Sequence, residues 1–410
     1  MDAPAPVCKG RSVDILRLTD DAFAPRADAI ARLRHEAFGM PVEEARRSVP
    51  APAGVTRYAA DDGGRPLALA NLLDHRAWFG GRPVPQAGIG GVTVAAEARG
   101  RGLLRPLLSQ LLRDARERGA AVSGLFPTAP GIYRGLGYEL VTARLTVPVE
   151  TGELAAIRPV DGLELRRLSG VDLPVLNELQ DRWAREQNCV LERSHGAGGL
   201  DVELDHGAQC SGAYADGELI GQLTWRRGGG PGPRDGSALS ALELVALDRG
   251  AATSLLALLG SFSSVAQRVE LRIGERDPWR LLLRSVATRV VDREDYMLRV
   301  LDVPAAWTGR GVAAGIDATV EFRCIGDPLG MTDGSYRLTA AGGVLDCAVV
   351  AAADPDLPTF TPGGLACWYA AAHSCATLRR LGLLSGGDPG QDPVLDALTG
   401  ERRPDVRDHF

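Results

Sequence analysis

The sequence is poor in lysine and has no excess of positive charge. Lys9 is the one lysine among 410 residues, and 52 acidic residues outnumber 46 basic ones, which leaves a formal charge of −6. A chain without a basic excess has no surface built to neutralise phosphates, so a nucleic-acid partner is not expected. The seven cysteines form no CxxC pair. We therefore expect reduced thiols and no bound metal.

Segments that would export the chain or anchor it in a bilayer are also missing. Met1–Pro6 has no basic region followed by an apolar run, so we expect no export signal. A long uncharged stretch, residues 250–267, contains several hydroxyl residues and two glycines, which favours a buried helix over a membrane span. The expectation is a cytoplasmic protein without a membrane partner.

The first 150 residues have the pattern of an α/β domain. The helix expected over residues 103–118 carries leucines at four-residue intervals on one face. A strand, helix, strand order of this length favours a partly parallel sheet. The other elements expected here are a strand at 13–18, a helix ending near Phe38, a hairpin that turns at residues 61–64, and strands at 89–94 and 121–126.

Two further domains are expected, with boundaries at residues 148–162 and near Pro304. Residues 163–260 repeat the strand, helix, hairpin, strand, helix order of the first domain, which indicates a second copy of one fold. Beyond it, strands at 318–324, 334–339 and 344–351 and one helix at 366–383 predict a small α+β domain. The domains are thus 1–150, 151–301 and 302–410, followed at the end by a polar tail from Ser385.

The sharpest local signal follows the strand Val92–Val94. A turn with Gly100 and Gly102 opens the leucine-rich helix, and such a helix N-terminus presents free backbone N–H groups and the positive end of the dipole. It is no nucleoside-triphosphate loop, since no Gly-Lys-Ser/Thr follows, and its spacing is not GxGxxG. On the glycines alone, an ordinary strand-to-helix turn is as good an interpretation as an anion site.

Two ordered motifs resemble the GCN5-related N-acetyltransferases (GNAT). The turn from Arg99 to Gly102 after a Val-x-Val strand is similar to motif A of that family, which holds the pyrophosphate of acetyl-CoA. Leu104 stands where the family usually has Gly or Ala. After the next expected strand, residues 131–138 read Gly-Ile-Tyr-Arg-Gly-Leu-Gly-Tyr and resemble the tyrosine-containing motif B.

The whole chain resembles the Eis-type (enhanced intracellular survival) acetyltransferases. Residues 101–105 and 131–138, the degenerate second copy, the third domain and the terminal Phe410 carry this resemblance. It implies two tandem GNAT folds, a C-terminal domain of sterol-carrier-protein type, and a homohexamer built as a trimer of dimers.

The resemblance also implies the site residues. Tyr133 is the expected proton donor to the leaving thiolate, because a phenol with a pKa of about 10 stays protonated at neutral pH. The α-carboxylate of Phe410 is the expected base; the alternative for Phe410 is a frayed terminus, and for Tyr133 a core aromatic. Thr128 and Ala129 are expected to complete the coenzyme site. The remaining expected contacts to acetyl-CoA are Val92, Thr93, Val94, Gly100, Arg101, Gly102, Leu103, Leu104 and Arg105.

The second copy lacks these features. Ala252 stands where Gly102 stands in the first copy, and no Gly-Ile-Tyr follows the next strand. We expect this copy to bind no acetyl-CoA and to serve as scaffold. In the third domain, Trp368 and Tyr369 are expected in the core, with a lipid cavity as the alternative.

These observations predict an acetyl-CoA-dependent N-acetyltransferase that acts on primary amines of a small polyamine-like or aminoglycoside-like acceptor. Two other functions stay open. One is acetylation of protein lysines or peptide N-termini, and the other is a non-catalytic scaffold that carries a lipid or another ligand.

Overall fold

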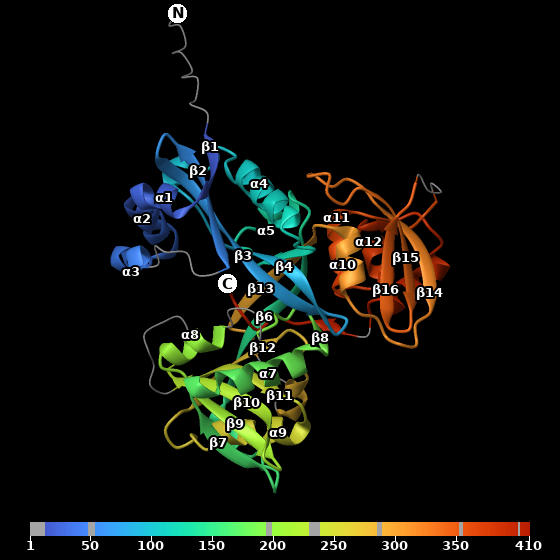
Figure 1. Cartoon of the computed structure of the whole chain (residues 1–410). Coiled ribbons are helices and arrows are strands. Elements are labelled where there is room, and N and C mark those ends of the chain that lie inside the picture. The colour runs from blue at the N-terminus through green and yellow to red at the C-terminus, as the bar shows by residue number, and fades with distance from the viewer. Residues whose placement is uncertain are drawn as a thin grey trace, which may run out of the picture. The chain divides into compact units, whose positions relative to one another are not determined.

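The computed structural model divides into two compact units. Figure 1 labels their helices and strands. The first comprises residues 1–74 and 87–120 with Phe410, and the second comprises residues 75–86 and 121–409. Strands β3 (Arg65–Phe79) and β4 (Arg82–Val94) contribute residues to both. The structure describes residues 13–47, 54–193, 199–228, 238–284, 289–351, 356–400 and 402–410.

The first unit is an antiparallel sheet with an amphipathic helix. The predicted hairpin is confirmed, because Gly63 and Gly64 adopt positive φ angles of 60° and 98° in the turn between β2 and β3. Helix α4 buries its predicted leucine face, and the Tyr58 hydroxyl of β2 donates to its Asp114 at 2.8 Å. The elements are β1 (Asp14–Leu18), α1 (Asp20–Phe23), α2 (Ala27–Phe38), α3 (Val42–Arg47), β2 (Val55–Asp62), part of β3 and β4, and α4 (Leu104–Glu117).

The second unit contains the predicted second copy in one sheet of order β5-β13-β6-β12-β11-β10-β9-β7. Strands β11 and β12 are parallel and joined by α9, whose apolar side chains fill the core beneath them. Residues 148–150, at the first expected boundary, belong to β6 and pair with β12. The elements are β5 (Val122–Leu125), α5 (Pro130–Arg134), β6 (Glu139–Glu150), α6 (Thr151–Ala155), β7 (Glu164–Leu168), α7 (Leu173–Ala184), β8 (Gln187–Asn188), α8 (Gly199–Asp205), β9 (Gln209–Ala215), β10 (Glu218–Arg227), β11 (Ala238–Ala246), α9 (Arg249–Gly260), β12 (Arg268–Gly274) and β13 (Asp292–Val300).

A separate five-stranded sheet of order β16-β15-β14-β17-β18 follows in the same unit. The single helix predicted at 366–383 is wrong: the chain forms two helices, because Ala371 takes a left-handed φ of 58° and the Ser374 hydroxyl caps a new helix by accepting from the Thr377 amide. The elements are α10 (Val303–Gly309), β14 (Ala318–Cys324), β15 (Gly334–Ala341), β16 (Val344–Val349), β17 (Thr359–Phe360), α11 (Pro362–Tyr369), α12 (Cys375–Arg380), β18 (Leu384–Ser385), α13 (Asp392–Ala397) and β19 (Arg403–Pro404).

Aromatic side chains fill the core of this sheet and its helices. The Trp368 ring stacks on Phe360 at 4.7 Å between centroids and contacts Trp307 at 4.4 Å. The Trp368 indole N–H donates to the carbonyl of Leu395 at 2.8 Å, so its polar atom is satisfied. Trp368 and Tyr369 are therefore core residues, as expected.

Among the described residues, no helix is both long and apolar enough to cross a bilayer. The uncharged stretch expected to be a buried helix forms α9, which ends at Gly260.

Replacement of Trp368 tests this core. We expect Trp368→Ala to destabilise the fold by about 3–5 kcal/mol, because it leaves a large cavity among packed rings. Leu381→Ala is the matched control, since Leu381 is 61% exposed and its truncation costs less than about 0.5 kcal/mol. Urea denaturation of both variants measures the difference. Equal midpoints would contradict a tightly packed aromatic core.

Candidate active site

The predicted glycine turn of the first unit is open to solvent. Gly100 and Gly102 adopt left-handed φ angles of 75° and 74°, a conformation that side chains other than glycine rarely take. A Cβ atom built at either position would meet no atom within 4 Å. Since Arg101 between them is also exposed, the backbone of this turn is free to approach a ligand closely.

The turn leads into the uncapped N-terminus of α4. The first bond of the helix runs from the Leu107 amide to the Leu103 carbonyl at 3.4 Å, so the amides of residues 103–105 have no acceptor within the helix. No side chain in the described part of the chain caps this end. The Arg101 amide differs, because it donates to the carbonyl of Ala98 at 3.4 Å. The amides of residues 103–105 are therefore better placed than that of Arg101 to donate to a ligand.

The terminal residue of the chain lies against β4, close to the strand segment expected to pair with pantetheine. A Cβ atom at Gly90 would lie 3.1 Å from the carboxyl carbon of Phe410 and 3.3 Å from its oxygen. The next residue, Gly91, has a φ of 59°, which marks an irregularity in the strand. Phe410 is therefore docked, contrary to the frayed-terminus alternative.

Sequence reasoning missed the role of Gly90, although the signal was present. Three glycines, Gly88, Gly90 and Gly91, fall within a strand that would otherwise favour β-branched residues. Glycine inside a strand often marks the close approach of another backbone, and here the approaching group is the chain terminus. Beyond it, Val92 and Val94 are half-buried while Thr93 is buried, so the valine face of β4 is the accessible one.

Motif B lies in the second unit. Its two tyrosines differ in their hydrogen bonding. The Tyr138 hydroxyl pairs with the Ser123 hydroxyl at 2.7 Å, whereas the Tyr133 hydroxyl has no hydrogen bond to another residue that the structure describes. Their rings meet edge to face at 6.1 Å. Burial raises the pKa of Tyr133, so its phenol stays protonated well above neutral pH. Thr128 and Ala129 are exposed just before α5.

The polar tail, which composition alone would place in solvent, is mostly buried in the second unit. Its strand β19 pairs with β8, and Asp405, Val406, Arg407 and Asp408 are each at most 7% exposed. Arg407 donates to Asp277 at 2.7 Å and to Asp405 at 3.1 Å. Burial raises the pKa of Asp405 to about 6 despite the nearby Arg407. Because Arg407 forms ion pairs inside the protein, this part of the tail can be buried despite its charges.

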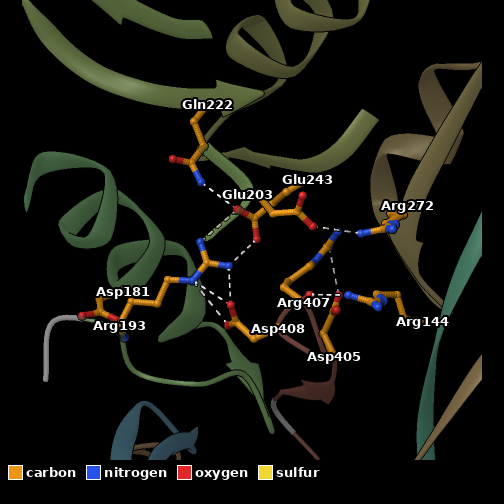
Figure 2. Close-up of polar contacts among 10 residues, drawn as sticks. All are labelled: Arg144, Asp181, Arg193, Glu203, Gln222, Glu243, Arg272, Asp405, Arg407 and Asp408. Atoms are coloured by element: carbon orange, nitrogen blue, oxygen red, sulfur yellow. Dashed lines mark hydrogen bonds and ion pairs between the residues drawn. The ribbon is translucent and has the colours of Figure 1, made fainter. Parts of the chain in front are cut away.

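One buried arginine holds the tail two residues before its end. Arg193 donates to both oxygens of Glu243, at 2.8 and 2.9 Å, and to Asp408 at 2.7 Å (Figure 2). Burial lowers the pKa of Arg193, but attraction to the two carboxylates outweighs it and the net pKa is raised. Because Glu243 lies on β11, the second copy of the fold supplies this anchor.

The helix N-terminus of the second copy is capped by a side chain, whereas the N-cap residue of α4 in the first copy provides no such cap. The Asp248 carboxylate accepts the Ala251 amide at 2.8 Å and so caps α9 with an internal anion. Ala252, the counterpart of Gly102, is fully buried. An internal carboxylate at the helix N-terminus repels a phosphate, which supports the expectation that this copy binds no coenzyme.

Comparisons with known proteins agree with the two motifs. Residues 17–141 and residues 182–300 each match a family model described as an acetyltransferase (GNAT) domain. The chain is 29% identical over 368 residues to the N-acetyltransferase Eis of Mycobacterium tuberculosis, covering 84% of this chain and 86% of that one. It is 28% identical over 309 residues to an N-acetyltransferase of Streptomyces avermitilis, covering 70% and 73%.

Solved structures show the same likeness along the full length. The crystal structure of a GCN5-related N-acetyltransferase from Kribbella flavida superposes with a TM-score of 0.81 at 27% identity, covering 97% of this chain and 99% of that one. Eis1 from Mycobacterium abscessus shares the fold, with a TM-score of 0.75 at 22% identity over 97% and 100%. The resemblance inferred from motifs A and B is confirmed, and the chain belongs to the Eis-type N-acetyltransferases of the GNAT superfamily.

Proposed function

We propose that this acetyltransferase uses acetyl-CoA and transfers its acetyl group to a primary amine of a small polyamine-like or aminoglycoside-like acceptor. The observation that carries the proposal is the exposed turn at Gly100–Gly102, where unpaired amides at a helix N-terminus suit a diphosphate. In this proposal the pantetheine amides pair with the backbone of Val92, Thr93 and Val94 at the end of β4, and Thr128 and Ala129 complete the site.

The reaction needs one proton acceptor and one proton donor. The amine nitrogen attacks the thioester carbonyl, the C–N bond forms and the C–S bond breaks. The Phe410 carboxylate accepts the proton of the attacking amine, and Gly90 leaves room for this carboxylate beside β4. The Tyr133 hydroxyl donates a proton to the departing thiolate. Exchange with water then returns Phe410 to its carboxylate and Tyr133 to its phenol.

The wider organisation is part of the same proposal. The domains are residues 1–150, 151–301 and 302–410, the third is of sterol-carrier-protein type, and the chain assembles in the cytoplasm as a hexamer of three dimers. The separate five-stranded sheet β16-β15-β14-β17-β18 supports a distinct third domain. Its packed aromatic core favours a structural role over a lipid carrier.

A charge placed in the glycine turn tests coenzyme binding. We expect Gly102→Asp to weaken acetyl-CoA binding by roughly tenfold or more, because a carboxylate there repels the diphosphate. Gly102→Asn is the matched control, since asparagine has the same shape and also tolerates a left-handed φ. Isothermal titration calorimetry measures both dissociation constants. Equal losses in the two variants would rule out an anion site at this turn.

The two motif B tyrosines test the proton donor. Tyr133→Phe should lower kcat roughly 100-fold with little change in acetyl-CoA affinity, because only the donor to the thiolate is lost. Tyr138→Phe removes a hydroxyl that already pairs with Ser123 and should leave kcat within a few-fold. Thiol-release kinetics measure both. Full activity of Tyr133→Phe at neutral pH would refute the assignment.

Removal of Phe410 tests the base. We expect the truncated chain to lose roughly 10²- to 10⁴-fold in kcat while it still binds acetyl-CoA. The control is Phe410→Leu, which keeps a terminal carboxylate and an apolar side chain and should lose much less. Thiol release against a panel of amines gives the rates. Unchanged turnover in the truncated chain would exclude a terminal carboxylate base.

A further inference from the structure

A charged pocket of about 400 Å³ lies in the second unit. Residues of β6, β10–β13, α8 and the tail line it, and its wall includes His409, the residue bonded to Phe410. A volume of this size accommodates a small polar molecule. None of the residues assigned above to acetyl-CoA lines the pocket.

The charges of the pocket balance. Four arginines and four carboxylates line it, so their formal sum is zero. A lining with equal numbers of both charges favours a ligand that carries a positive and a negative group over one that carries positive groups alone. The charged lining residues are Arg144, Arg193, Arg272, Arg407, Glu203, Glu243, Glu294 and Asp408.

Most of these charges already have close partners. Arg193 bonds Glu243 and Asp408 within the network of Figure 2. Arg144 donates to the Oε2 atom of Glu294 at 2.7 Å and to the Arg407 carbonyl at 2.9 Å. These contacts leave little capacity for a ligand on Arg193, on Arg144 and on the Oε2 atom of Glu294.

Arg272 is weakly paired, and Glu294, although its Oε2 atom is bound by Arg144, has a second oxygen without a hydrogen bond to a described residue. The one ion pair of Arg272 within the described chain is to Glu203 at 3.5 Å, longer than a hydrogen bond, and its side chain is 29% exposed. The Oε1 atom of Glu294 has only His409, at 3.6 Å, among the residues that the structure describes, and the Glu294 side chain is 30% exposed. One cation and one carboxylate oxygen are thus available in the same pocket.

The neighbouring charged groups leave Arg272 and Glu294 available to a ligand. Burial lowers the pKa of His409, and Arg144 and Arg272 lower it further against the opposing effect of Glu294. His409 is therefore neutral at pH 7 and does not cancel Glu294. Burial lowers the pKa of Arg272 and Arg144 lowers it further, against the opposing effects of Glu203 and Glu294.

We propose that this pocket selects among the small polyamine-like acceptors, and that it favours those that also carry a carboxylate, which are small diamino acids. Arg272 binds the carboxylate, Glu294 binds the α-ammonium group, and the distal amine receives the acetyl group. This inference rests on the proposed function, since the bond changes are those given above. Arg272 and Glu294 are specificity-determining residues and take no part in proton transfer.

Matched amines test the proposal. Lysine and cadaverine differ by one carboxylate, as do ornithine and putrescine. We expect kcat/KM for acetylation of each diamino acid to exceed that of its diamine by roughly tenfold or more, because a bond between the half-buried Arg272 and a carboxylate is added. Mass spectrometry should place the acetyl group on the distal nitrogen. A ratio of one or below, or acetylation of the α-amine, would overturn the proposal.

Substitutions test whether Arg272 causes the preference for diamino acids over diamines. Arg272→Gln should reduce the lysine-to-cadaverine ratio roughly tenfold, and Arg272→Lys should restore part of it. The matched control is Arg226→Gln, which removes the other arginine near Glu203 without changing the pocket lining. A ratio that falls equally in Arg226→Gln would contradict the role of Arg272.

The outcomes separate this inference from the proposed function. Thiol release with diamines and aminoglycosides but no preference for diamino acids would refute the pocket assignment alone. No thiol release with any amine, in a chain shown to be folded, would refute the proposed function itself.

Discussion

The structure depends on one buried guanidinium. Arg193 is shared between Glu243 of the second copy and Asp408 of the tail, and all three side chains are at most 9% exposed. Removal of one partner would leave a buried charge without compensation, which typically costs about 3–5 kcal/mol. This interaction gives the degenerate copy a physical purpose, because it holds a segment that carries the terminal carboxylate two residues further along the chain.

The two copies of the fold differ in how their helices begin. In the first copy, left-handed glycines expose the amides of α4 to an external anion. In the second, Asp248 supplies an internal anion to α9, and the adjacent Ala252 is packed in the core. An internal carboxylate thus caps the N-terminus of α9 and stabilises that helix end, whereas the N-cap residue of α4 makes no side-chain cap.

The charged tail illustrates why sequence reasoning failed in places. Its aspartates and arginines have the composition of a solvated segment, but Arg407 pairs with Asp277 and Asp408 pairs with Arg193, both far away in the sequence. The helix expected at 366–383 failed for a related reason. Alanines favour a continuous helix, and the left-handed Ala371 persists because tertiary packing overrides propensity. The local sequence reveals neither the distant ion-pair partners of the tail nor the packing around Ala371.

The sequence by itself determined the family, the repeated α/β pattern, the glycine turn before α4 and the tyrosine motif, because each depends on residues close together along the chain. Only the tertiary structure decided that the Tyr138 hydroxyl is hydrogen-bonded to Ser123 while that of Tyr133 has no such bond to a residue that the structure describes. It also decided that Phe410 lies close to the backbone of Gly90 and that Arg193 binds the tail through Asp408. These contacts join residues brought together by folding, and their energies depend on burial, which no local pattern encodes.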